Sequence, residues 1–130
     1  MNIKLKYVIL FVENVETSRT FYADAFGLEK GFIADGGDYG EMTTGETTLS
    51  FSSRKLMREL GKNPGRPDTT APTFEIAIEV DDVPGALARA LGAGATLVQD
   101  VKQEAWGQTT SYVRDLDGYL VEICSPVVAS

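Results

Sequence analysis

Glu122 is a carboxylate in the middle of a segment that otherwise has the composition of a buried strand. The segment YLVEIC (119–124) follows the polar turn DLDG (115–118). An ionised carboxylate that is buried without a partner is costly, so such groups are normally paired, bound to a metal or protonated. We therefore expect Glu122 to face a polar group, an ion or a ligand.

A second carboxylate, Glu75, stands at the start of the strand segment EIAIEV (75–80). Side chains alternate between the two faces of a strand, so residues two apart share a face. If Ile76 and Ile78 face a core, then Glu75, Ala77 and Glu79 share the opposite face of the strand. The same rule puts Leu120, Glu122 and Cys124 together on one face of the last strand.

The nucleophiles of this chain have no histidine to activate them, because its 130 residues include none. A Ser-His-Asp arrangement at Ser50, Ser52 or Ser53 is therefore excluded. The single cysteine, Cys124, lies in an apolar strand, where a packed and inert thiol is expected. It cannot form an intrachain disulfide.

Composition and charge narrow the classes of protein further. The chain is 43% hydrophobic and 24% charged, with a net charge of −7 and a pI near 4.5. Nucleic acid is not expected as a partner, because phosphate binding needs a basic surface; an acidic surface attracts cations. The apolar run 7–12 is too short for a signal peptide or a membrane span, so we expect no membrane partner and a cytoplasmic location.

The chain repeats one plan twice. Each half has a strand, then a helix that begins at Asn14 or Asp82 and ends at a glycine, then three strands. The three strands are expected near 28–34, 38–44 and 46–53, and again near 95–102, 106–114 and 118–124. We predict one α+β domain, 1–130, of two β-α-β-β-β modules (about 1–53 and 73–130). The basic connector 54–72 begins with a short helix at 54–60; it is a solvated helix face or a lid over an anionic ligand.

This plan and several motifs resemble the vicinal oxygen chelate superfamily, which includes glyoxalase I, extradiol dioxygenases and bleomycin-resistance proteins. The segment VENVETSRTFY (12–22) is close to the family pattern V-x-D-x-x-x-S-x-x-F-Y. Four other segments match in order and spacing: FGL (26–28), VDDV (80–83), WGQT (106–109) and DLDGYLVE (115–122). The resemblance implies an open, cup-like eight-stranded sheet with helices on its convex side, and a homodimer.

The resemblance also implies four metal-ligand positions. They fall on Tyr7, Glu75, Leu49 or Ser50, and Glu122. The usual histidines are missing, so neither a zinc site nor a two-histidine iron site is expected. Two carboxylates remain as ligands for Mg²⁺ or Mn²⁺, or as polar groups that line a wet cavity.

We therefore predict a protein that binds a small organic, cationic ligand without a transition metal. The predicted ligand-binding residues are Tyr7, Glu75, Trp106 and Glu122. Trp106 either stacks on the ligand or covers the core. The alternative is a lyase, isomerase or dioxygenase-like enzyme in which Glu122 or Glu75 serves as base or as a ligand of a divalent ion.

Overall fold

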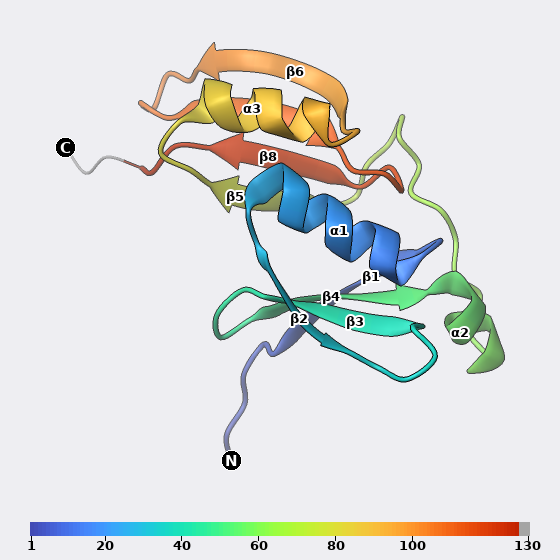
Figure 1. Cartoon of the computed structure of the whole chain (residues 1–130). Helices are drawn as coiled ribbons and strands as arrows, with labels where there is room; N and C mark the ends of the chain where they lie inside the picture. The colour runs from blue at the N-terminus through green and yellow to red at the C-terminus, as the bar shows by residue number, and fades with distance from the viewer. Residues whose placement is uncertain (128–130) are drawn as a thin grey trace. The chain divides into compact units, whose positions relative to one another are not determined.

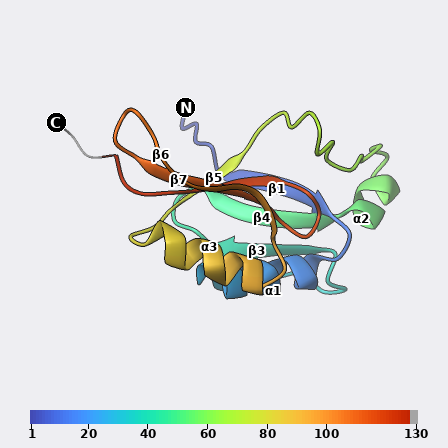
Figure 2. The ribbon, with the colours of Figure 1, turned by 90° about the horizontal axis from the view of Figure 1, so that it is seen from above.

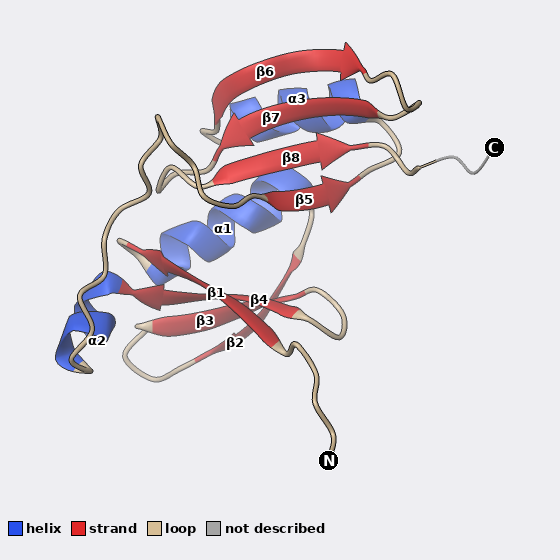
Figure 3. Cartoon of the chain, turned by 180° about the vertical axis from the view of Figure 1, so that it is seen from behind, coloured by secondary structure: helices blue, strands red, loops and turns tan. Residues whose placement is uncertain are grey.

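The computed structural model describes residues 1–127 of the chain as two open four-stranded mixed sheets with three helices (Figures 1 and 3). The chain divides into two compact units. Unit 1 comprises Met1–Ala23 and Gly27–Arg66, and unit 2 comprises Asp24–Phe26 and Pro67–Ser130. The predicted α+β class and the two β-α-β-β-β modules are confirmed.

Unit 1 holds the first sheet, in the order β1-β4-β3-β2, with β1 and β4 parallel. Its strands are β1 (Tyr7–Val12), β2 (Glu29–Ile33), β3 (Tyr39–Thr43) and β4 (Thr48–Ser53). Helix α1 (Val15–Phe26) follows β1, and the short α2 (Arg54–Glu59) follows β4.

Unit 2 repeats this plan in the order β5-β8-β7-β6, with β5 and β8 parallel. Its elements are β5 (Ile76–Glu79), α3 (Val83–Gly92), β6 (Thr96–Gln103), β7 (Thr109–Arg114) and β8 (Leu120–Cys124). Helix α3 covers one face of this sheet (Figure 2). In each unit we call the sheet face on the helix side the helix face, and the other the open face.

Helix α1 begins and ends where the sequence predicts. The Asn14 side chain accepts a hydrogen bond from the Thr17 N–H at 2.9 Å, and Gly27 ends the helix with φ 70°. A left-handed residue at this position favours glycine, which has no Cβ to clash. The helix packs on its sheet through Tyr22, whose ring centroid lies 5.4 Å from that of Phe51.

Helix α3 has the equivalent cap, because the Asp82 side chain accepts from the Gly85 N–H at 3.0 Å. Its buried residues are Val83, Leu87 and Ala90. On the helix face of the sheet, Val113, Val121 and Ile123 have no exposed surface. Burial of this apolar surface is the main force that holds the module together.

Strand pairing makes the two sheets comparable position by position. Val8 pairs with Leu49 and Ile9 with Ser50 in unit 1, whereas Ile76 pairs with Val121 and Ala77 with Glu122 in unit 2. Val8 of β1 and Ile76 of β5 occupy equivalent positions, so the residues before them, Tyr7 and Glu75, are also equivalent. The register therefore makes Ser50, not Leu49, the counterpart of Glu122.

The connector is predicted to be a solvated basic face, but its first residue, Arg54, is buried. The side chain of Arg54 is 5% exposed and its Nη2 lies 2.9 Å from Glu13 Oε2. Arg66 also reaches this carboxylate, at 3.5 Å, and the pKa of Glu13 is lowered, first by the hydrogen bond from Arg54. Glu13 thus pairs with both ends of the segment 54–66, through the buried Arg54 and the exposed Arg66.

Several strand boundaries also differ from the predicted ones. Strand β7 begins at Thr109 rather than near 106, because Glu104 and Gly107 form a turn in which the Gly107 N–H donates to the Glu104 carbonyl at 3.0 Å. Strand β4 begins at Thr48 rather than 46. In the described part of the chain, no helix has the length and apolar character to cross a membrane.

Candidate functional site

The open face of unit 2 brings two carboxylates to one phenol. The Tyr112 hydroxyl lies 2.8 Å from Glu122 Oε2 and 3.2 Å from Glu75 Oε2. The structure thus places two of the predicted ligand-binding residues, Glu75 and Glu122, around a tyrosine that the sequence analysis did not select.

Sheet register explains this meeting. Tyr112 pairs directly with Glu122 across β7 and β8. Ala77 is the partner of Glu122 on the other side, and Glu75 precedes it by two residues, so its side chain has the same orientation. Strand β8 lies between β5 and β7, so the 3.2 Å contact is made because the long side chains of Glu75 and Tyr112 both extend over the open face of β8.

The two carboxylates compete for the single hydrogen of the Tyr112 hydroxyl. Burial raises the pKa of Tyr112, and the hydrogen bond and charge of Glu122 raise it further, with a smaller contribution from Glu75. The phenol therefore stays protonated at neutral pH and donates. One donor cannot satisfy two carboxylates fully, so the cluster retains the capacity to accept hydrogen bonds from a ligand.

Cys124 lies next to Glu122 on this face and is 7% exposed. Burial raises the pKa of its thiol, and the Glu122 carboxylate raises it further. A neutral buried thiol is a poor nucleophile. This environment agrees with the inert role that the sequence indicates.

The donors on this face do not fit a transition metal. They are two carboxylates and a neutral phenol, and the chain has no imidazole; zinc favours nitrogen and sulfur ligands. Within residues 1–127 no group of three His, Cys, Asp or Glu side chains is close enough to hold a metal ion. Glu75 and Glu122 alone are the kind of oxygen ligand that Mg²⁺ or Mn²⁺ accepts together with waters.

The remaining predicted residues lie elsewhere. Tyr7 belongs to unit 1, where its side chain is half-exposed and the Lys6 Nζ lies 5.7 Å from the ring centroid. Ser50 is fully buried on the open face of that unit, and Leu49 lies on the helix face.

Trp106 lies in the β6–β7 turn of unit 2 and is 63% exposed, so it does not cover the core. Its Nε1–H donates to Gln108 Oε1 at 2.7 Å, and Gln108 Nε2 donates to the Ser125 carbonyl at 2.9 Å. These bonds hold the indole ring in place while leaving most of its surface to solvent.

Sequence reasoning missed Tyr112, although a signal was present. In TTSYVR (109–114), Val113 is the aliphatic residue suited to the core, which by alternation assigns Thr110, Tyr112 and Arg114 to the opposite face. A tyrosine on the face that carries Glu122 was therefore predictable once the hairpin register was assumed.

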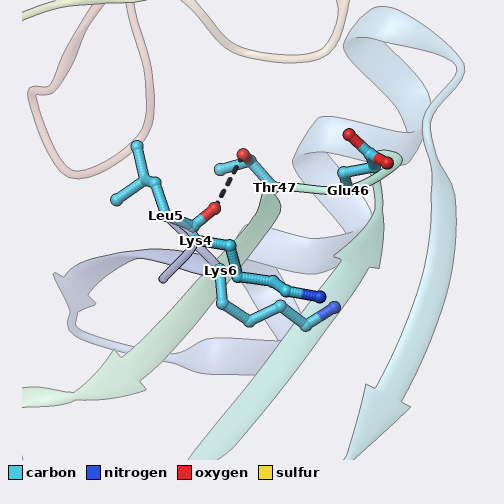
Figure 4. A pocket seen from close by; sticks show the side chains of 5 residues that line it. All are labelled: Lys4, Leu5, Lys6, Glu46 and Thr47. Atoms are coloured by element: carbon cyan, nitrogen blue, oxygen red, sulfur yellow. Dashed lines mark hydrogen bonds between the residues drawn. The ribbon is translucent and has the colours of Figure 1, made fainter. Parts of the chain in front are cut away.

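Two cavities of the described chain are lined by residues outside this cluster. One of about 420 Å³ in unit 1 is lined by Lys4, Leu5, Lys6, Glu46 and Thr47 (Figure 4). Another of about 290 Å³ in unit 2 is lined by Asp81, Asp82, Val83, Pro84, Thr109 and Ser125. Neither contains Glu75, Tyr112 or Glu122.

The fold and this face define a protein of paired β-α-β-β-β modules, the architecture of the vicinal oxygen chelate superfamily. A sequence model described as a glyoxalase-like domain matches residues 5–128, and the chain belongs to that family. No functionally curated protein is similar enough in sequence to count as a match.

Solved structures support the fold. A glyoxalase-related enzyme from Fulvimarina pelagi has 22% identity over 95% of this chain and 88% of its own, with a TM-score of 0.81. A glyoxalase/bleomycin resistance protein/dioxygenase family enzyme from Burkholderia phytofirmans has 18% identity over 97% and 100%, with a TM-score of 0.79. A lactoylglutathione lyase from Agrobacterium tumefaciens has 17% identity over 94% and 92%, with a TM-score of 0.67.

Proposed function

We propose that this glyoxalase-like protein binds a small organic cation on the open face of unit 2 without a transition metal. The observation that carries this proposal is the approach of Glu75 and Glu122 to one hydroxyl, that of Tyr112. Two like charges that share one donor repel each other, and a ligand cation relieves that repulsion.

The surroundings of the cluster support a cationic ligand. Glu79 shares the face of Glu75 by strand alternation, and Glu104 accepts a hydrogen bond from Thr110 Oγ1 at 2.9 Å. Two basic residues share this face: Arg114, two residues beyond Tyr112 in β7, and Lys102 of β6, which pairs with Thr110 and lies 3.7 Å from Glu104. The four carboxylates are Glu75, Glu79, Glu104 and Glu122. Carboxylates therefore outnumber cations on this face.

A catalytic role is the rival function, and the hydrogen bond between Tyr112 and Glu122 is the observation that favours it. A carboxylate held by a neutral phenol is positioned to take a proton from a bound substrate. In that reading Glu122 or Glu75 acts as the base, alone or beside an Mg²⁺ or Mn²⁺ ion that both carboxylates would bind.

The test is calorimetric titration of the wild type, Glu122→Gln and the control Glu46→Gln. The cations are bleomycin and spermidine, and benzoate is the anion. Each variant loses one negative charge, but only Glu122→Gln alters the cluster. Loss of one charge-assisted contact should weaken cation binding about 10- to 100-fold. Exclusive binding of benzoate, or equal cation affinity of Glu122→Gln and wild type, would contradict the proposal.

Two further parts of the proposal rest on the sequence: a homodimer and a location in the cytoplasm. The dimer is supported by the exposed apolar side chains of edge strand β6, Leu97, Val98 and Val101. Uncovered edge strands and apolar surface commonly mark an interface.

A further inference from the structure

The hairpin turn between β2 and β3 contains one of the two Asp-Gly pairs of the chain. The pairs are Asp35–Gly36 and Asp117–Gly118, and the sequence has no Asn-Gly pair. In such a pair the backbone nitrogen of glycine can attack the side-chain carboxyl of aspartate, because glycine has no Cβ to shield that nitrogen. The reaction depends on exposure and on how firmly the fold holds the two residues. The two turns differ in both respects.

The turn at Asp35 is open to solvent and weakly held. Asp35 and Gly36 are both exposed. Within residues 1–127, neither the Asp35 side chain nor the Gly36 N–H has a hydrogen-bond or ion-pair partner. The turn is closed by the bond from the Gly37 N–H to the Ala34 carbonyl at 3.0 Å. A Cβ placed on Gly36 or Gly37 would meet nothing within 4 Å, so the space around the turn is empty.

Two consecutive glycines make this turn easy to open. Gly36 has φ 87° and Gly37 has φ 78°. A left-handed glycine at the third position of a hydrogen-bonded turn is the arrangement of a type II turn. For attack, ψ of Asp35 must rotate until the Gly36 nitrogen reaches the side-chain carbonyl carbon. Because glycine populates both signs of φ readily, the two glycines allow the backbone to follow this rotation at low cost.

The second Asp-Gly pair is held far more firmly. The Gly118 N–H, whose nitrogen would be the nucleophile, donates to the Asp115 carbonyl at 3.1 Å. The Asp115 side chain accepts from the N–H groups of Asp117 and Tyr119 at 3.0 and 2.9 Å. A Cβ at Gly118 would lie 3.3 Å from Thr69 Cγ2, so the connector also covers this turn. The same rotation here must break several hydrogen bonds at once.

We propose that Asp35–Gly36 is a site of spontaneous isoaspartate formation in the folded protein, and that Asp117–Gly118 is protected from it. The Gly36 nitrogen forms a bond to Asp35 Cγ, and a carboxyl oxygen leaves as water with the amide hydrogen and one proton from solvent. Water then opens the succinimide ring. Attack at Cγ restores aspartate. Attack at the main-chain carbonyl carbon breaks its bond to nitrogen, so the chain runs through Cγ and the former carbonyl becomes a free carboxylate.

Isoaspartate at residue 35 changes the backbone but not the charge. The chain gains one carbon atom inside the turn, whose length sets the bond from the Gly37 N–H to the Ala34 carbonyl and that from the Ala34 N–H to the Tyr39 carbonyl at 2.9 Å. The modification therefore loosens this end of the β2–β3 hairpin. The new carboxylate is a substrate for isoaspartate methyltransferases: its oxygen takes the methyl group from the sulfonium of S-adenosylmethionine, and S-adenosylhomocysteine leaves.

The experiment ages the full chain at neutral pH, folded and in urea, and digests it with trypsin. The peptides are then methylated by an isoaspartate methyltransferase with tritiated S-adenosylmethionine. Trypsin separates the two pairs, because Asp35–Gly36 lies in peptide 31–54 and Asp117–Gly118 in peptide 115–130. In the folded protein, label should accumulate in peptide 31–54 about 10-fold faster or more than in peptide 115–130, the factor implied by the loss of two hydrogen bonds. In urea the two peptides should be labelled at similar rates.

Variants assign the label to the residue. Asp35→Glu keeps the charge but requires a larger ring that forms slowly, so it should remove the label from peptide 31–54. The matched control Asp117→Glu makes the same change at the other pair and should leave the label in peptide 31–54 unchanged. Three results would overturn the proposal: equal labelling of the two peptides in the folded protein, label in peptide 31–54 only after treatment with urea, or undiminished label in that peptide of Asp35→Glu.

Discussion

Tyr112 is the residue on which the unit 2 cluster depends. Its hydroxyl contacts Glu122 and Glu75, which come from different strands, and holds the Glu122 side chain across the β7–β8 pair. Burial and the nearby carboxylates favour the protonated forms of Tyr112 and Cys124, and burial and Glu41 do so for Tyr39. Each of these three groups has a raised pKa in the folded chain.

Stability should therefore fall as pH rises through the alkaline range. The ordinary pKa values are 9.0 for the thiol and 10.0 for the phenols. Above about pH 9 the unfolded chain loses protons that the folded chain keeps, so the free energy of unfolding decreases with pH. Urea unfolding between neutral and alkaline pH measures this slope.

Tyr112→Phe removes one of the three groups and should make this alkaline slope shallower. Glu122→Gln should act in the same direction, because it removes the carboxylate that raises the pKa of Tyr112 and Cys124. A slope in Tyr112→Phe identical to that of the wild type would show that the phenol is not held in its protonated form by the fold.

At the scale of elements, the contact between α1 and β3 leaves no room for a side chain at Gly40. A Cβ there would stand 2.7 Å from Arg19 Cδ and 2.9 Å from Val15 Cγ1. Arg19 cannot simply move aside, because it is buried and bonded to the carbonyl oxygens of Gly31 and Glu41.

Gly40→Ala should therefore destabilise the protein by about 1–3 kcal/mol, the usual cost of overpacking. The matched control is Gly65→Ala, because a Cβ at Gly65 meets nothing within 4 Å. Chemical unfolding of both variants measures the difference. Equal stability of the two would mean that α1 does not press on β3 in this way.

The sequence predicts elements better than pairs of side chains. Asn14 and Gly27 fix α1 through local capping, and alternation correctly groups Glu122 with Cys124. It could not choose between Leu49 and Ser50, because that choice depends on pairing with β1. Nor could it bring Tyr112 to Glu122, since the register of β7 and β8 is set by the turn at Asp115–Gly118, where the Asp115 N–H bonds the Tyr119 carbonyl.

At the scale of the whole molecule, four sheet edges and a net charge of −7 have opposite effects on association. Edges such as β2, with Phe32 and Ile33 exposed, favour pairing with another chain. A high net charge opposes non-specific aggregation, so a specific interface is the outcome we expect.

Native mass spectrometry of protein purified from cells should show a homodimer of the 14.1 kDa chain without stoichiometric zinc, iron, nickel or cobalt. The reasons are the exposed edges and the absence of histidine. A monomer at micromolar concentrations would contradict the dimer. One chelator-removable transition metal per chain would contradict the metal-free site.

Trp106 is the single tryptophan of the chain, and it lies in unit 2. Its intrinsic fluorescence is therefore a spectroscopic reporter of that unit alone, through the hydrogen bonds that join it to Gln108 and Gln108 to Ser125. Because the ring is already largely exposed, intensity will be more informative than emission wavelength. If the two units unfold together, the unfolding curves followed by tryptophan emission and by circular dichroism will coincide. If unit 1 unfolds separately, circular dichroism will record a transition that tryptophan emission does not.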